Sequence, residues 1–207
     1  MKFLTLLSAA VLVSATVSAQ RLGGNHNEEV EPTNTGFGIK GGVNIASIYN
    51  QTEGLEAEGI TSYHAGAYGR LGVTESFALQ LEALYSRRGF DFKDGGDDAP
   101  KFRFDYIDVP LLFVYNVVGD GTFSIMAGPQ ASLMITLKDQ NDKEIDKTGF
   151  HTFDFGAAGG VQFGYKILRA GVRYNIGFLD VVNENENPDS PYNFKNHFGQ
   201  VYLGVEF

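Results

Sequence analysis

The chain has 207 residues, including 26 glycines, 17 phenylalanines and 10 tyrosines, and it contains neither cysteine nor tryptophan. Without cysteine there is no disulfide framework, thiol nucleophile, haem attachment site or cysteine-based zinc site. A formal net charge of −9 at pH 7 excludes nucleic acid as a natural partner, because binding to phosphates requires a surplus of lysine and arginine.

The first 19 residues, MKFLTLLSAAVLVSATVSA, have the pattern of a secretory signal peptide. Lys2 precedes an apolar run over residues 3–13, and Val17 and Ala19 stand at the spacing of a cleavage site. The apolar run is shorter than the roughly 20 residues that span a bilayer, so we expect cleavage after Ala19 and export. Residues 20–35 are polar and aperiodic, and we interpret them as a flexible leader.

From Gly36 onward, apolar residues alternate with polar residues or glycine, which is the two-residue period of β-strands. Eight stretches show this alternation, at about residues 36–45, 62–73, 77–86, 106–115, 123–135, 153–163, 168–178 and 200–207. Pro110 and Pro129 fall within two of them. Because proline cannot donate to a ladder, we expect bulges or strand ends at these two positions.

The connections between these stretches alternate in length. The short ones lie near residues 74–76, 116–121 and 164–167, and the long ones near 48–60, 88–101, 138–149 and 179–195. Short periplasmic turns and longer external loops are typical of barrels in bacterial outer membranes. We therefore predict an all-β fold over residues 36–207, an eight-stranded antiparallel up-and-down transmembrane β-barrel with both termini on the periplasmic side.

The second face of these strands is rich in glycine and carries charges of both signs. Its bases are Lys40, Arg70, Arg169 and Arg173, and its acids are Glu82, Asp108, Asp154 and Glu206. Buried charges are costly unless they are paired, but equal numbers of both signs can neutralise one another inside a narrow lumen. Aromatic residues on the apolar face fall near strand ends, as interfacial girdles do. We therefore predict that the apolar face meets lipid and that the charged residues form a lumen network.

Gly36, Gly38 and Gly41 have the G-x-G-x-x-G spacing of a dinucleotide-binding loop. That motif requires a turn from a strand into a helix, whereas these glycines lie on an alternating stretch. We interpret them as strand residues, and the sequence predicts no cofactor.

Several segments, in their order and spacing, resemble the PorT-like outer-membrane β-barrel proteins typical of Bacteroidota. They are GFGIKGGVN, LQLEALYSRRG, YIDVPLLFVYN, AGPQAS, FDFGAAGG and GVRYNIG, followed by a terminal phenylalanine. The resemblance implies the outer membrane of a Gram-negative envelope, with membrane lipid and the barrel assembly machinery as partners. It also implies that Phe207 forms part of the signal which that machinery reads. Some family members belong to the gliding and type IX secretion apparatus.

Two residue sets have the residue types of chemical sites. Ser62, His64 and Asp154 supply the residue types of a nucleophile, a base and a carboxylate, as a lipid-modifying membrane enzyme would need. The segment DFKDGGDDAP places four aspartates around two glycines but lacks the spacing of an EF-hand, which makes them weak metal candidates: Asp91, Asp94, Asp97 and Asp98. Neither pattern is specific, and we expect no enzyme.

Eight strands enclose an interior that side chains fill, which argues against a diffusion pore. The long loops are all acidic, with formal charges of −3, −1, −1 and −3 in chain order. The leading interpretation is a small non-porin outer-membrane barrel, a structural or surface-recognition and adhesion protein acting through acidic external loops. The alternatives are an accessory of envelope biogenesis or type IX secretion, a lipid-modifying barrel enzyme, and a soluble lipocalin-like carrier.

Overall fold

The computed structural model describes residues 34–50, 57–59, 61–92, 101–118, 121–138, 152–180 and 194–207. The expected signal peptide, residues 1–19, and all but the last two residues of the expected leader lie outside this set. No helix within the described residues is long and apolar enough to cross a membrane.

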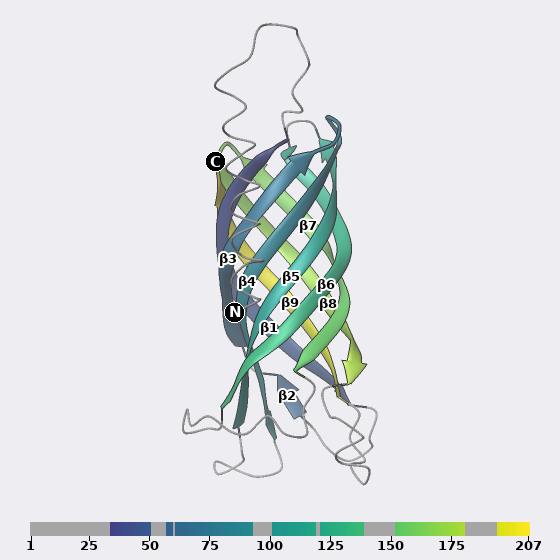
Figure 1. The fold of residues 1–207 in the computed structure, drawn as a ribbon. Helices are drawn as coiled ribbons and strands as arrows, with labels where there is room; N and C mark the ends of the chain where they lie inside the picture. The colour runs from purple at the N-terminus through teal and green to yellow at the C-terminus, as the bar shows by residue number, and fades with distance from the viewer. Residues whose placement is uncertain are drawn as a thin grey trace, which may run out of the picture.

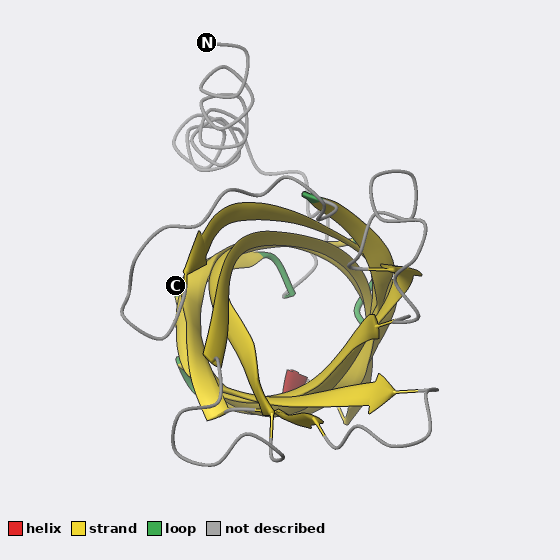
Figure 2. Ribbon diagram, turned by 90° about the horizontal axis from the view of Figure 1, so that it is seen from below, coloured by secondary structure: helices red, strands yellow, loops and turns green. Residues whose placement is uncertain are grey.

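The described residues form nine β-strands: β1 Gly36–Asn50, β2 Ala57–Gly59, β3 Thr61–Gly72, β4 Phe77–Phe92, β5 Lys101–Val118, β6 Phe123–Lys138, β7 Phe153–Tyr165, β8 Leu168–Asp180 and β9 Phe194–Glu206. All except β2 pair antiparallel with the preceding and following long strand, and β1 also pairs with β9, which closes the ring. The predicted eight-stranded antiparallel barrel is confirmed, and Figures 1 and 2 show it from the side and along its axis.

The two ends of the barrel differ. At the short-turn end, residues 73–76 join β3 to β4 and residues 166–167 join β7 to β8. At the opposite, long-loop end, the strands run further than the sequence pattern predicted, since β4 continues to Phe92 and β5 begins at Lys101. There β2, which was not predicted, pairs with the last residues of β4. On the β5 extension the apolar residues fall on the inward face, since Phe104 and Tyr106 are 4% and 2% exposed, so the pattern that marks the lipid face elsewhere is reversed there.

The prediction of bulges or strand ends at the two prolines was wrong. Pro110 lies inside β5 and Pro129 inside β6, and the register is the same on both sides of each proline. The shifts in the β5–β6 ladder occur instead nearer the ends of β5, at Asp105/Tyr106 and Asn116/Val118. Proline removes only one ladder donor, and each proline keeps a partner on its other side, Gln130 and Ala157 respectively.

The apolar side chains point outward and the polar ones inward. On β4, Leu81 is 46% exposed, whereas its neighbours Gln80 and Glu82 are 0% and 1% exposed. Exposed and buried positions alternate along the other long strands as well, so the outer surface is an apolar band and the interior holds most of the polar side chains, as in membrane barrels, although β5 and β6 also turn apolar side chains inward. A soluble carrier has the opposite arrangement, and this finding excludes the lipocalin-like alternative.

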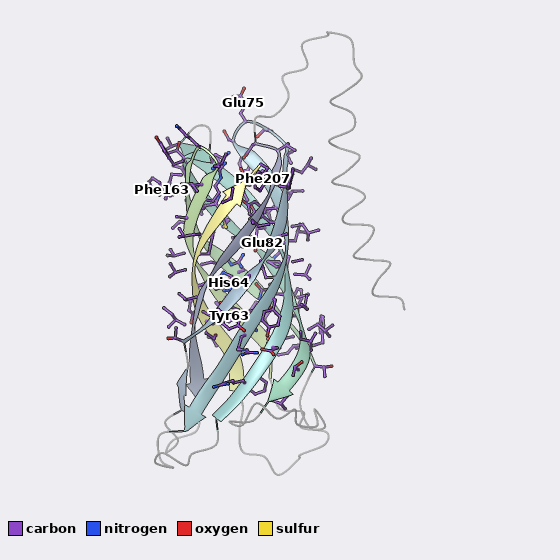
Figure 3. All side chains as sticks on the ribbon, turned by 90° about the vertical axis from the view of Figure 1, so that its left-hand side faces the viewer. Tyr63, His64, Glu75, Glu82, Phe163 and Phe207 are labelled. Atoms are coloured by element: carbon purple, nitrogen blue, oxygen red, sulfur yellow. The ribbon has the colours of Figure 1, made fainter. Side chains whose placement is uncertain are left out.

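Outward aromatic rings gather at both ends of the band. Near the short-turn end the ring pairs are Phe37 with Phe207, Phe77 with Tyr115, and Phe123 with Phe163, at 4.9–5.5 Å. Nearer the long-loop end they are Tyr63 with Tyr85 at 6.1 Å and Phe155 with Phe178 at 6.3 Å. Figure 3 shows Phe163 and Phe207 near one end and Tyr63 in the other half of the barrel. These pairs form two girdles of the kind that mark membrane interfaces.

The glycine spacing of β1 has a packing explanation. A Cβ atom added to Gly38 would lie 2.6 Å from the ring of Tyr68, its partner on β3. Likewise, a Cβ on Gly171 would lie 2.5 Å from the ring of Tyr202 on β9. These glycines therefore leave room for inward tyrosines to lie flat over the neighbouring strand.

We expect Leu81→Arg to lower the free energy of unfolding in lipid vesicles by about 2–4 kcal/mol, the cost of a cation near the middle of the lipid face. The measurement is denaturant titration of the protein in vesicles, with Leu81→Met as the apolar control. Equal stability of the two variants would contradict the outward orientation of the apolar face.

Candidate functional site: the barrel interior

The centre of the interior is a charge layer around Glu82. Lys40 Nζ of β1 lies 2.7 Å from Glu82 Oε2, and Arg173 Nη1 of β8 lies 2.8 Å from the same oxygen. The side chains of all three residues are at most 1% exposed. Because β4 and β8 are diametrically opposite in the ring, the contact between Glu82 and Arg173 crosses the lumen.

Two glutamines extend this layer. Gln80 Nε2 donates to Glu82 Oε1 at 2.6 Å, and its Oε1 accepts from Arg70 Nε and Nη2 at 2.9 and 2.6 Å. Gln200 Oε1 accepts from Arg173 Nε and Nη2 at 2.9 and 2.6 Å. The amide oxygens thus accept hydrogen bonds from guanidinium N–H groups that the single carboxylate does not bind.

A second layer lies toward the short-turn end, around Glu206. Arg169 Nη2 is 2.5 Å from Glu206 Oε1, and Tyr68 donates its hydroxyl to Oε2 at 3.0 Å. Arg70 Nη1 lies 3.6 Å from Oε2, so Arg70 joins the two layers. This layer is more accessible than the central one, with Glu206 12% exposed.

A third layer lies toward the long-loop end. Arg88 Nη2 is 2.5 and 2.6 Å from the two oxygens of Asp108, and its guanidinium stands 3.9 Å from the ring centre of Phe198 and 4.5 Å from that of Tyr106. Arg88 was missed from the sequence, which placed residues 88–101 in a loop. The signal was present, because even-numbered residues of β4 face inward and Arg88 continues that series.

The eight charged residues expected to line the lumen are all described. Seven of them lie in these three layers. The eighth, Asp154, faces the interior from the start of β7, where it is 8% exposed and pairs in register with Ser132 of β6.

His64 and Asn44 form a polar cluster next to the central layer. The His64 Nδ1 atom is 2.8 Å from Asn44 Oδ1, which also accepts from Gln200 Nε2 at 2.9 Å. Asn44 Nδ2 donates to Ser86 Oγ at 3.0 Å and to the Arg87 carbonyl at 2.8 Å. Because Asn44 Oδ1 can only accept, His64 carries its proton on Nδ1. Figure 3 shows His64 between the levels of Glu82 and Tyr63.

The residue types weighed for a lipid-modifying enzyme do not form a nucleophile, base and acid array. Ser62 donates to the carbonyl oxygen of Arg87 at 2.5 Å. The partner of His64 Nδ1 is Asn44, in the place where such an array would need a carboxylate.

The weak metal candidates fall largely outside the described residues. The backbone of Asp91 lies at the end of β4, paired with Lys101, and Asp94, Asp97 and Asp98 are beyond the described range. Within the strands and turns that are described, no three His, Asp or Glu side chains are grouped so that they could hold a metal ion.

The remaining interior is also occupied by side chains. An apolar cluster lines the wall formed by β4 to β7 and consists of Ala78, Leu112, Val114, Met126 and Ala158. Tyr202 reaches this side from β9, and its hydroxyl donates to Gln162 Oε1 of β7 at 3.2 Å. Apolar and aromatic side chains therefore occupy part of the interior beside the charge layers.

A model of the protein family described as "Outer membrane protein beta-barrel domain" matches residues 19–183. No curated protein matches the chain.

Solved structures share the fold at low sequence identity. Neisserial surface protein A (NspA) aligns with a TM-score of 0.52 and 14% identity, over 83% of this chain and 97% of that one. Ail, the attachment invasion locus protein of Yersinia pestis, aligns at 0.51 and 12%, over 84% and 99%. Ail in complex with the heparin analogue sucrose octasulfate aligns at 0.50 and 13%, over 84% and 99%.

We expect Glu82→Gln to destabilise the barrel by roughly 3–5 kcal/mol, because it removes the one carboxylate that contacts both Lys40 and Arg173 and leaves buried cations uncompensated. Glu206→Gln is the matched control at a more accessible site, and its cost should be smaller. Both variants are compared by denaturant titration in the same vesicles. Equal losses in the free energy of unfolding would contradict the central role of Glu82.

Proposed function

We propose, from the premise that the chain belongs to the family of outer membrane protein beta-barrel domains, that it is a non-enzymatic surface-recognition or adhesion protein. One observation carries the proposal. The interior is crossed by buried contacts such as that between Glu82 and Arg173, so its polar groups serve the barrel itself. Recognition is then left to the segments that join the strands at the long-loop end.

Those segments are acidic, which supports their role as the recognition surface. Between the strand ends, residues 51–56, 93–100 and 139–152 each carry a formal charge of −2, and residues 181–193 carry −3. Several bases of the same region lie on the strands instead, among them Arg88, Lys101 and Lys138. Negative charge therefore concentrates in the connecting segments, and it favours a basic partner.

The charge also separates this chain from one of its structural neighbours. Ail has been solved with a heparin analogue, which is a polyanion. Acidic segments would repel such a ligand, so we infer a cationic surface as the partner class here.

The orientation follows from the two ends of the barrel. We infer that the short-turn end, with Phe207 and the start of β1, faces the periplasm, and that the acidic segments face outward. Phe207 packs its ring 5.5 Å from Phe37 and exchanges backbone hydrogen bonds with it at 2.7 and 3.2 Å. We propose this terminal aromatic residue as part of the signal for the assembly machinery, in keeping with the resemblance to PorT-like barrels.

The recognition proposal is tested with the full chain in zwitterionic nanodiscs, measured against immobilised poly-L-lysine and immobilised heparin. We expect binding to poly-L-lysine alone. The triple variant Glu184→Gln, Glu186→Gln, Asp189→Asn should weaken it by about threefold or more, since an ion pair in water contributes up to about 1 kcal/mol. Glu75→Gln, an exposed acid at the short-turn end, is the control and should have no effect. Equal heparin binding, or an unaffected triple variant, would contradict the proposal.

The orientation is tested by labelling, which the absence of native cysteine makes simple. Intact cells that carry Asp189→Cys should react with a membrane-impermeant maleimide. Cells that carry Glu75→Cys should react only after the outer membrane is opened (Figure 3). Labelling of position 75 in intact cells would reverse the inferred orientation.

A further inference from the structure

The wall of the barrel has a seam between β7 and β8 at the long-loop end. The β7–β8 ladder runs from Tyr165 and Leu168 to its last pair, Gly156 and Gly177. Both strands continue for three more residues, to Phe153 and Asp180, without pairing to each other. Over these three residues, β7 pairs with β6. Figure 1 shows the end of β8 as the arrowhead at the lower right.

The β8 side of the seam is irregular as well. The β8–β9 ladder shifts register between Ile176 and Asp180, so Phe178 and Leu179 pair with neither adjacent strand among the described residues. Both side chains point outward, at 52% and 42% exposed, as expected of a bulge. Among the described residues, the ladders therefore give this part of β8 no register partner on the side of the seam.

The outer side of the seam is apolar and aromatic. Phe155 and Phe178 face each other across it, with ring centres 6.3 Å apart, and they are 44% and 52% exposed. These rings belong to the girdle at the long-loop end. An alkyl chain could lie against them in the outer part of the membrane.

Beside the seam, the inner face carries two buried amide oxygens that accept from no donor among the described residues. Asn175 is 1% exposed, its Nδ2 donates to the Phe198 carbonyl at 3.4 Å, and its Oδ1 has no hydrogen-bond partner among the described residues. Gln130, 6% exposed, pairs in register with Gly156, and within the described part of the chain its Oε1 also has no hydrogen-bond partner. Gly156 and Gly177 add no side chain between these two amides. Buried acceptors in this state require an explanation.

We propose that the seam binds an amphiphile from the membrane, one whose head group donates hydrogen bonds. The head group, an ammonium above all, reaches the oxygens of Asn175 and Gln130, while its alkyl chain lies on Phe155 and Phe178. A carboxylate head group has no hydrogen to donate to these oxygens, so the seam disfavours an anionic head group of that kind. This lipid site is separate from the acidic segments and does not depend on the recognition function.

The test uses the full chain in phosphatidylcholine nanodiscs with a single introduced tryptophan, since the chain has none. Phe178→Trp places the reporter in the seam. Phe163→Trp places it at an outward site where the ladder is complete, 61% exposed and paired in register with Ala170. The probes are dodecylammonium and dodecanoate, which share a chain length and differ in the charge of the head group.

We expect dodecylammonium to change the emission of the Phe178→Trp protein saturably, with no saturable change at position 163. Dodecanoate should bind at least about fivefold more weakly, and adding Asn175→Leu should weaken dodecylammonium by about fivefold, the loss of one hydrogen bond. Gln130→Met is the second variant if Asn175→Leu does not fold, as judged by heat-shifted gel mobility. Equal responses at positions 163 and 178, no preference for ammonium, or no effect of either amide variant would overturn the proposal.

Discussion

Within the hydrocarbon of a membrane a strand has no water to bond with, so each backbone donor and acceptor must find a partner in the neighbouring strand. The chain meets this constraint by closing its sheet, with β1 paired to β9 and β4 paired to β5. Closure with eight strands fixes a narrow interior, in which side chains from opposite walls can touch. The contact between Glu82 and Arg173 is possible only because the interior is this narrow. Beside Gly156 the β7–β8 ladder ends three residues before the strands do, which leaves the seam in the wall.

The interior then has to accommodate charge at low cost. Glu82 contacts two cations directly. The amide oxygens of the glutamines at 80 and 200 accept hydrogen bonds from the guanidinium N–H groups that Glu82 does not bind. Such fully hydrogen-bonded networks hold buried charges that would otherwise be strongly destabilising. The polar groups of this central layer thus serve the stability of the barrel.

The barrel could be predicted from the sequence because alternation of apolar residues carries most of the information about strands and faces. The pattern of apolar residues outside and polar residues inside reverses at the long-loop end, where Phe104 and Leu137 face inward, and there Arg88 and the strand β2 were missed. Which charges would meet could not be predicted, because contacts across the lumen depend on the stagger of the strands. Asn44 illustrates this, since its five partners come from three other strands and an amide in a sequence gives no sign of such a role.

The separation of the central ion pair along the chain has a consequence for how the barrel forms. Glu82 and Arg173 are 91 residues apart and sit on strands that face each other across the ring. Neither can meet the other until the intervening strands have joined on both sides, and until then each charge stays hydrated. The pair therefore forms late, and its dehydration adds a barrier near the end of folding that slows both closing and reopening of the ring.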